Sequence, residues 1–156
     1  MKTPPGYEIL EQLGDGGQGE VFKARQIHLD RIVALKTAKP TASGKSFSQN
    51  LERLLREART IAKFDHPNIV RVFDCFVFED CIYIVMEFLD GHPLNELLEA
   101  RTPDALQAFH RDMLQTPGRL RDDWSLLIAV MIARALEYSH GHGIYHRDLK
   151  PSNIFI

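Results

Sequence analysis

A glycine-rich segment between two runs of strand-forming residues places the strongest constraint on how this chain can fold. Residues 14–19 read Gly-Asp-Gly-Gly-Gln-Gly and contain the pattern G-x-G-x-x-G. Missing side chains let backbone N–H groups approach phosphate oxygens closely. A dinucleotide-binding fold needs a helix directly after such glycines, whereas residues 20–25 favour a strand. The segment is therefore predicted to form the tip of a β-hairpin. The alternative is a glycine-rich turn that binds nothing.

A cation follows the glycines at the end of a third predicted strand, residues 31–37. Residues 33–36 read Val-Ala-Leu-Lys, which would bring Lys36 to phosphates held under the loop. The alternative is an ordinary strand lysine whose ammonium reaches solvent. Residues 44–46, Gly-Lys-Ser, imitate the end of a Walker A loop, but the first glycine of that loop would fall at Lys39. A P-loop is therefore rejected.

The next segment predicts a helix and then a second hairpin. Apolar residues at positions 47, 51, 54, 55, 58, 61 and 62 recur on one helical face. Glu57 lies closer to this face than Glu52 and is the expected carboxylate partner of Lys36, unless it is a solvated flank residue. Residues 69–78 and 81–89 are rich in strand formers and pair most simply with each other. Five antiparallel strands and one helix are expected within residues 1–90.

The character of the sequence changes after position 90. Residues 94–98 predict a short helix, and a long helix is expected through residues 124–138 with Asp122 or Asp123 as its cap. Apolar residues at positions 105, 106, 109 and 113 suggest an additional surface helix, with an insert that docks a partner as the alternative. The fold class is therefore α+β, with a second, helical lobe beginning at residue 91.

The most specific string lies at residues 144–154, Ile-Tyr-His-Arg-Asp-Leu-Lys-Pro-Ser-Asn-Ile. It resembles the catalytic loop H-R-D-x-K-P-x-N of the eukaryotic-type (Hanks-type) serine/threonine protein kinases, and the glycine-rich segment and Val-Ala-Leu-Lys resemble other motifs of that family in the right order. The resemblance covers essentially the whole chain. It implies a protein-kinase-like fold, with residues 1–90 as the ATP-binding N-lobe and hinge and residues 91–156 as an incomplete C-lobe.

The resemblance also implies catalytic roles. Asp148 is similar to the residue that accepts the proton of the substrate hydroxyl, Lys150 to the lysine that touches the γ-phosphate, and Asn153 to a magnesium ligand. Lys150 followed by Pro151 resembles kinases that act on serine and threonine. The expected reaction is transfer of the γ-phosphoryl group of ATP to Ser or Thr hydroxyls of protein substrates, with Mg²⁺.

Residues 86–89, Met-Glu-Phe-Leu, resemble the gatekeeper and hinge, whose backbone groups would hydrogen-bond adenine. Plain core packing is the alternative for the apolar residues around them. The nucleotide-contacting residues that the resemblance implies are Leu13, Gly14, Asp15, Gly16, Gly17, Gln18, Gly19, Val21, Ala34, Lys36, Glu57, Met86, Glu87 and Leu89.

The family's D-F-G segment does not follow Asn153 in this sequence. Asn153 would have to hold magnesium nearly alone, although hard cations take several oxygen ligands. We therefore expect a kinase domain cut short after its catalytic loop. The alternative is a catalytically inactive, truncated kinase-like protein that serves as a binding partner or scaffold.

Composition argues against other classes of partner. A formal net charge of −2 gives no electrostatic reason to expect nucleic acid. The longest apolar stretch, residues 126–133, is far shorter than the roughly 18 residues of a membrane span. The N-terminus lacks the apolar core of a signal peptide. A cytoplasmic protein is expected, with Cys75 and Cys81 as packed thiols rather than a hairpin disulfide.

Overall fold

The computed structural model describes residues 3–16, 19–38, 52, 55–56, 58–79, 81–99, 112–116 and 118–156. The chain divides into two compact units, Met1–Phe88 and Leu89–Ile156. Each unit contains a hydrophobic cluster of its own.

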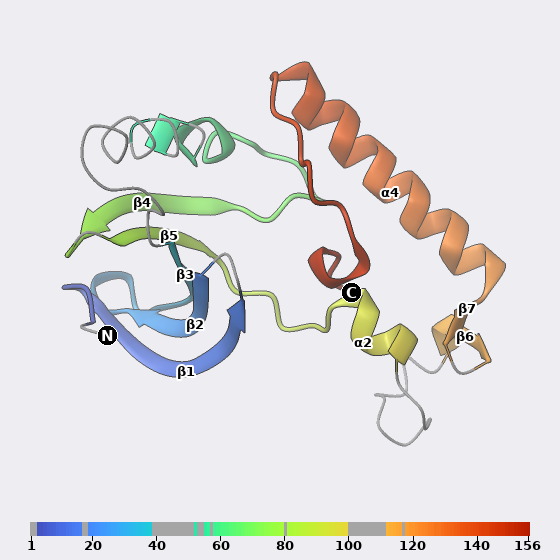
Figure 1. The fold of residues 1–156 in the computed structure, drawn as a ribbon, viewed down its shortest axis with the longest axis horizontal. Helices are drawn as coiled ribbons and strands as arrows, with labels where there is room; N and C mark the ends of the chain where they lie inside the picture. The colour runs from blue at the N-terminus through green and yellow to red at the C-terminus, as the bar shows by residue number, and fades with distance from the viewer. Residues whose placement is uncertain are drawn as a thin grey trace. The chain divides into compact units, whose positions relative to one another are not determined.

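The first unit is built on a five-stranded antiparallel sheet, which confirms the predicted fold class (Figure 1). Its strands are β1 (Tyr7–Gly16), β2 (Gly19–Gln26), β3 (Arg31–Ala38), β4 (Val72–Phe78) and β5 (Cys81–Glu87). They lie in the order β1-β2-β3-β5-β4, so β3 is hydrogen-bonded along both edges. A short 3-10 helix, η1 (Ile27–Leu29), joins β2 to β3.

Alternate residues of the central strands form the core of this unit. Val33 and Leu35 in β3 and Val85 in β5 are fully buried, and Phe22 and Ala24 in β2 pack with them. Because successive side chains of a strand point to opposite faces, the residues between these core positions lie on the other face of the sheet. Of the candidate nucleotide-binding residues in these strands, Val21, Ala34, Lys36 and Met86 occupy that second face, whereas Glu87 is opposed by Val33 of the core face.

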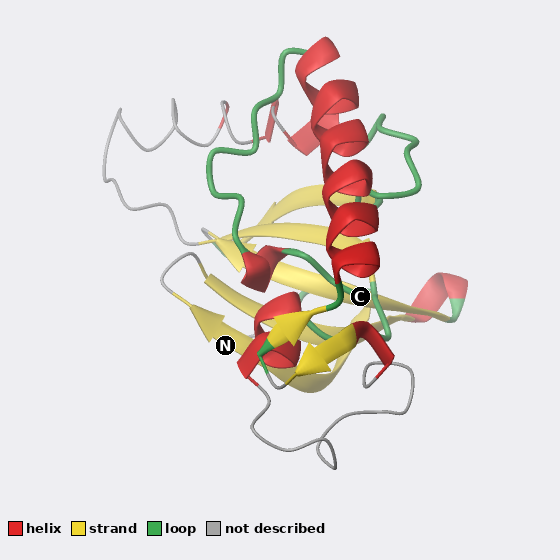
Figure 2. Ribbon diagram, turned by 90° about the vertical axis from the view of Figure 1, so that its right-hand side faces the viewer, coloured by secondary structure: helices red, strands yellow, loops and turns green. Residues whose placement is uncertain are grey.

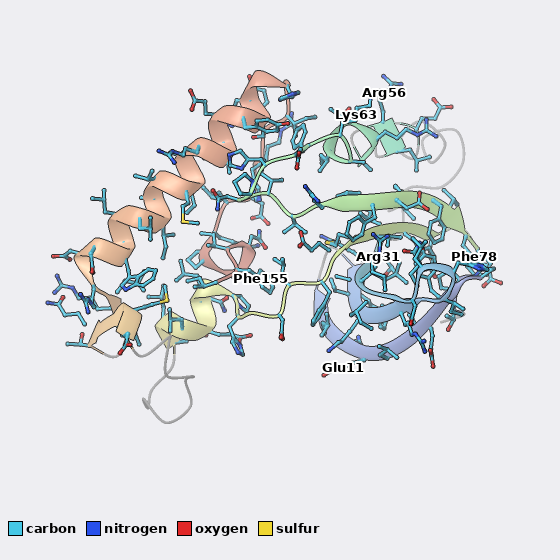
Figure 3. All side chains as sticks on the ribbon, turned by 180° about the vertical axis from the view of Figure 1, so that it is seen from behind. Glu11, Arg31, Arg56, Lys63, Phe78 and Phe155 are labelled. Atoms are coloured by element: carbon cyan, nitrogen blue, oxygen red, sulfur yellow. The ribbon has the colours of Figure 1, made fainter. Side chains whose placement is uncertain are left out.

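Stacked aromatic rings close the core at the edges of the sheet. The ring of Phe76 in β4 lies 5.7 Å from Tyr7 in β1 and 5.5 Å from Tyr83 in β5, measured between centroids. Phe78, at the end of β4 (Figure 3), tilts against Tyr83 at 6.3 Å. Because β1 and β4 are the two edge strands, the Tyr7–Phe76 contact shows that the sheet curves until its edges meet.

Between β3 and β4 the described helical residues are 52, 55–56 and 58–61, and the rest of the predicted helix lies outside the described residues. The strand predicted from residue 69 begins at Val72. A turn occupies the preceding residues instead. The Ile69 N–H donates to the His66 carbonyl at 3.1 Å, and the Asn68 N–H donates to His66 Nδ1 at 3.1 Å.

The second unit consists of α2 (Leu94–Glu99), a two-stranded hairpin of β6 (Leu114–Thr116) and β7 (Arg119–Leu120), α4 (Asp122–Gly141) and the 3-10 helix η3 (Pro151–Asn153). Figure 2 shows the two short arrows of this hairpin and the long helix α4. Within the described part of the chain, no helix is both long and apolar enough to cross a bilayer.

Two details of the second unit differ from expectation. Helical residues end at Met113, and the β6–β7 hairpin, which the helical spacing did not predict, follows. Gly118 turns this hairpin with a φ of 79°, a conformation that favours glycine. In addition, α4 begins at Asp122, so Asp122 and Asp123 lie in its first turn rather than capping it. Carboxylates there still interact favourably with the positive end of the helix dipole.

Leu35→Ala tests the core of the first unit. Removing this fully buried side chain should lower the free energy of unfolding by about 2–5 kcal/mol, because the cavity cannot fully collapse between β2 and β5. Urea denaturation followed by circular dichroism measures the change. The control is Leu29→Ala at a side chain that is 63% exposed. Equal losses in the two variants would contradict this account of the core.

Candidate active site

The glycine-rich segment forms the tip of the β1–β2 hairpin. The two strands stay paired, with two register shifts on the β1 side, up to the pairs Asp15–Glu20 and Gly16–Gly19. Gly17 and Gln18, between them, lie outside the described residues. Gly19 has a φ of 126°, which residues with side chains rarely adopt. The backbone at the end of the hairpin therefore depends on glycine at position 19.

A buried threonine holds the base of this hairpin to β3. The β2–β3 ladder ends at the pair Val21–Lys36, so Glu20 and Thr37 stand opposite each other just beyond it. The Thr37 hydroxyl accepts a hydrogen bond from the Glu20 N–H at 3.3 Å and donates to the Glu20 carbonyl at 3.4 Å. Thr37 is only 3% exposed. Its hydroxyl thus replaces the next backbone pair of the ladder.

Lys36 lies on the face of the sheet opposite the core. In antiparallel pairs, directly opposed residues point to the same face, and Lys36 is opposed by Val21 in β2 and Ile84 in β5. Two residues along β3, and therefore on the same face, Ala34 is opposed by Met86 in β5. The register therefore gathers four of the predicted nucleotide-contacting residues, Val21, Ala34, Lys36 and Met86, on one face.

Glu57 is the expected carboxylate partner of Lys36. Glu57 lies outside the described residues. Within the residues that the structure describes, Lys36 forms no ion pair. The pairing of Lys36 with Glu57 stays a prediction.

The candidate hinge begins where β5 ends. The Glu87 N–H donates to the Arg71 carbonyl at 2.9 Å, so this amide is already engaged within the first unit. Leu89 belongs to the second unit. A cation lies beside the hinge, since Lys23 Nζ is 4.5 Å from the centroid of the Phe88 ring. Sequence reasoning missed Lys23, although its spacing from Val21 places it on the same face of β2.

Leu13 and Gly14 lie where β1 departs from regular pairing. Gln12 opposes Phe22 and Gly14 opposes Val21, so Leu13 is the extra residue of an irregularity in β1. Its side chain is 45% exposed. A Cβ at Gly14 would meet nothing within 4 Å. Leu13 is therefore available to cover a ligand, and Gly14 leaves open space beside it.

In the second unit, the segment after α4 turns sharply before the catalytic string. The Ile144 N–H donates to the Ser139 carbonyl at 3.0 Å, which ends the helix. Arg147 has a φ of 60°, an uncommon conformation for a residue other than glycine. The next amide, of Asp148, donates to His146 Nδ1 at 3.3 Å. Such backbone outliers cluster at functional sites.

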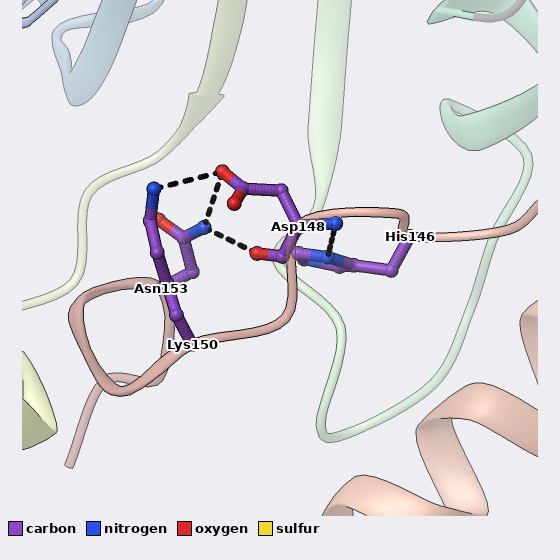
Figure 4. Close-up of polar contacts among 4 residues, drawn as sticks. All are labelled: His146, Asp148, Lys150 and Asn153. Atoms are coloured by element: carbon purple, nitrogen blue, oxygen red, sulfur yellow. Dashed lines mark hydrogen bonds and ion pairs between the residues drawn. The ribbon is translucent and has the colours of Figure 1, made fainter.

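Asp148, Lys150 and Asn153 meet in one polar network (Figure 4). Lys150 Nζ lies 2.9 Å from Asp148 Oδ2. Asn153 Nδ2 donates to the Asp148 main-chain carbonyl at 2.8 Å and to Asp148 Oδ2 at 3.3 Å. The 3-10 helix η3 makes this possible because it returns the chain toward Asp148 within five residues. The structure thus brings the three predicted catalytic residues together.

The network keeps Asp148 ionised. The hydrogen bond from Lys150 lowers the pKa of the Asp148 carboxyl below its ordinary value, and the charge of Lys150, the amide of Asn153 and His146 act in the same direction. An ionised carboxylate only accepts hydrogen bonds. Asp148 is therefore an acceptor in this site, flanked by one cation and one amide.

The donor chemistry of this network suits a hard cation. Asn153 turns its nitrogen toward Asp148, so its amide oxygen is directed away from these bonds. Oxygen ligands of this kind suit magnesium. Among the described residues, no group of three His, Cys, Asp or Glu side chains could hold an ion by itself.

Comparison with known proteins confirms the resemblance to protein kinases. The family model for the protein kinase domain matches residues 7–156. The chain is 36% identical over 151 residues to serine/threonine-protein kinase PrkC of Bacillus subtilis, covering 96% of this chain and 20% of PrkC. It is 38% identical over 165 residues to serine/threonine-protein kinase PknB of Mycobacterium leprae, covering 100% of this chain and 24% of PknB.

A solved structure supports the fold. The crystal structure of the Mycobacterium tuberculosis PknI kinase domain, determined for a point mutant, is similar with a TM-score of 0.76 and 28% sequence identity. The match covers 99% of this chain and 56% of that one. The chain thus spans about a fifth to a quarter of the two curated relatives it is compared with and just over half of the solved domain.

Thr37→Val tests how the glycine-rich hairpin is held. Valine keeps the shape and strand preference of threonine but leaves the Glu20 N–H without its partner, so this amide should exchange with solvent about tenfold faster. Hydrogen exchange followed by NMR measures the rate. Thr37→Ser should restore slow exchange. Fast exchange in the serine variant as well would assign the effect to packing.

Lys150→Met tests the electrostatics of the network. Removing the ammonium should raise the pKa of Asp148, which an NMR titration of the carboxyl carbon measures. Because the folded pKa lies below the unfolded one, the network's contribution to stability is present above the unfolded pKa and lost as pH falls through the folded pKa. In the variant the folded pKa should lie closer to the unfolded one, so the pH range over which this stability is lost should become narrower. An unchanged Asp148 pKa would contradict the ion pair.

Proposed function

Because the chain belongs to the protein kinase family of the Hanks type, we propose that it binds ATP with magnesium and transfers the γ-phosphoryl group to Ser or Thr hydroxyls of protein substrates. The observation that carries this proposal is the network of Asp148, Lys150 and Asn153. A carboxylate acceptor, a cation and an amide oxygen within one loop are the groups that phosphoryl transfer between a hydroxyl and a phosphate requires.

Asp148 orients the attacking hydroxyl. Its carboxylate accepts the hydroxyl hydrogen bond, the oxygen forms a bond to the γ-phosphorus, and the bond from phosphorus to the ADP oxygen breaks. The proton of the hydroxyl passes to Asp148. The proton moves late, after the phosphoryl group has begun to transfer, in line with a loose transition state.

The two lysines supply fixed positive charge. Lys36 lies on the face of the sheet that also carries Val21, Ala34 and Met86, so an adenine nucleotide on this face would lie close to its ammonium. Lys150 is already held at Asp148. Charge that develops on the phosphoryl oxygens is stabilised most when cations are in place before the reaction. The glycine-rich hairpin adds backbone N–H donors.

Magnesium is the proposed metal, and Asn153 the residue of this chain that holds it. When bound, the ion neutralises charge on the phosphate oxygens. Asn153 serves two purposes in this arrangement. Its nitrogen fixes Asp148, and its oxygen, which these bonds leave free, would be the ligand to the metal.

The proposed acceptors are Ser and Thr residues of proteins, and the proposed compartment is the cytosol. The order Lys150-Pro151 and the names of the relatives support Ser and Thr as acceptors. Cys75 and Cys81 are free thiols. Burial raises the pKa of the Cys75 thiol, which keeps it protonated and unreactive. Two free thiols fit a reducing compartment.

Lys36→Met tests the proposed function. Loss of the ammonium should weaken ATP binding in the presence of magnesium about tenfold or more, because a hydrogen bond to a charged group contributes about 1.5–3 kcal/mol. Isothermal titration calorimetry with ATP, with and without magnesium, measures the affinity, and transfer of labelled phosphate to casein measures turnover.

The control is Lys63→Met at an exposed lysine beyond the described helical residues (Figure 3), which should bind ATP like the parent chain. Asp148→Asn should keep ATP binding and lose phosphate transfer. A parent chain that folds and yet ignores ATP would refute the proposal and favour the scaffold alternative.

A further inference from the structure

We propose that Gly91 is a positioning residue for Asn153, and through it for Asp148. The proposal rests on the function proposed above, because it assigns to Gly91 the placement of the phosphoryl-transfer loop. It begins from a short ladder in the second unit. The residues just after Asn153 run antiparallel to the residues just after Gly91, and an isolated bridge joins Pro93 to Phe155. Figure 3 shows Phe155 beside α2.

Three backbone hydrogen bonds define this ladder. The His92 N–H donates to the Ile156 carbonyl at 3.1 Å, and the Ile156 N–H donates to the His92 carbonyl at 3.0 Å. The Leu94 N–H donates to the Ile154 carbonyl at 2.7 Å. Ile154 and Ile156 also pack, partly buried, against the core residues of α2. The chain that leaves the catalytic loop is therefore fixed to the chain that enters α2.

Gly91 leaves no room for a side chain beside this ladder. A Cβ atom on Gly91 would lie 2.5 Å from the Ile156 carbonyl oxygen and 3.2 Å from its carbon. Real Cβ atoms do not approach a backbone oxygen so closely, and a backbone atom cannot move aside as a flexible side chain can. Gly91 is not among the glycines with a positive φ. The need for glycine at position 91 is therefore steric and not conformational.

A side chain at position 91 would displace Ile156, and Ile156 is close in the chain to Asn153. Ile154 is bonded to η3 through its N–H, which donates to the Pro151 carbonyl at 3.2 Å. Asn153 is the last residue of η3 and donates to both Asp148 oxygens already described. Only two residues separate Asn153 from Ile156. The part of a shift at Ile156 that Ile154 and Phe155 do not absorb therefore reaches η3 and Asn153.

Gly91→Ala and Gly141→Ala form a matched pair of variants. A Cβ on Gly141, the last residue of α4, would meet nothing within 4 Å. Both changes replace glycine by alanine in the same unit, and only the first meets a backbone oxygen. Gly141→Ala should behave like the parent chain in every measurement below.

NMR without nucleotide provides the test. In Gly91→Ala, the Leu94 and Ile156 amides should exchange about tenfold faster as the ladder opens, and the Asn153 side-chain NH₂ signals should move as its hydrogen bonds to Asp148 weaken. Unchanged exchange and unchanged Asn153 signals in a folded variant would overturn the proposal. So would equal changes in Gly141→Ala.

A second variant covers the case in which Gly91→Ala does not fold, as judged by circular dichroism. Ile156→Pro removes the hydrogen bond from Ile156 to His92 without adding an atom at position 91. It should move the Asn153 signals in the same direction and by less. Absence of any such movement would overturn the proposal. These readouts need no nucleotide, so failure of ATP binding by the parent chain would refute the function and leave the Gly91 result standing.

Discussion

The pairing of β3 along both of its edges is the constraint on which the first unit depends. Because β2 and β5 are hydrogen-bonded to the same strand, the register of one sheet decides two things at once. It buries Val33 and Leu35 on one face, and it turns Lys36 and Ala34 to the other. A slip of one residue would exchange these faces. Stability and site geometry therefore share the same hydrogen bonds.

The second unit holds its candidate site differently, because the site residues lie on a loop rather than on a sheet. A loop has few backbone bonds of its own, and its side chains must be held from outside or by one another. Here both occur. Asp148 is held by Lys150 and Asn153, while the residues after Asn153 are held by those after Gly91. The left-handed Arg147 is tolerated because the chain is fixed on both sides of it.

Much of this arrangement could be predicted from sequence, for physical reasons that differ between residues. Asp148, Lys150 and Asn153 lie within six residues, so local spacing already limits how far apart they can be. Lys36 could be assigned to a strand by its apolar neighbours. Thr37 could not be singled out, since its hydrogen bonds depend on the β2–β3 register, which no local pattern reveals. The β6–β7 hairpin was missed because helical spacing continues up to Met113. Gly91 gave no signal at all, because its neighbour Ile156 is distant in the chain.

The ion pair of Lys150 with Asp148 also implies a sequence of events in time. In the proposed reaction Lys150 is shared between a carboxylate that is present from the start and a phosphate that arrives with the nucleotide. As Lys150 turns toward the phosphate, its hydrogen bond to Asp148 weakens, and the main cause of the low Asp148 pKa is withdrawn. Asp148 then becomes more basic only while a phosphoryl group is in place. In the proposed reaction, Asp148 is thus a weak base in the resting loop, and arrival of the nucleotide makes it a stronger one.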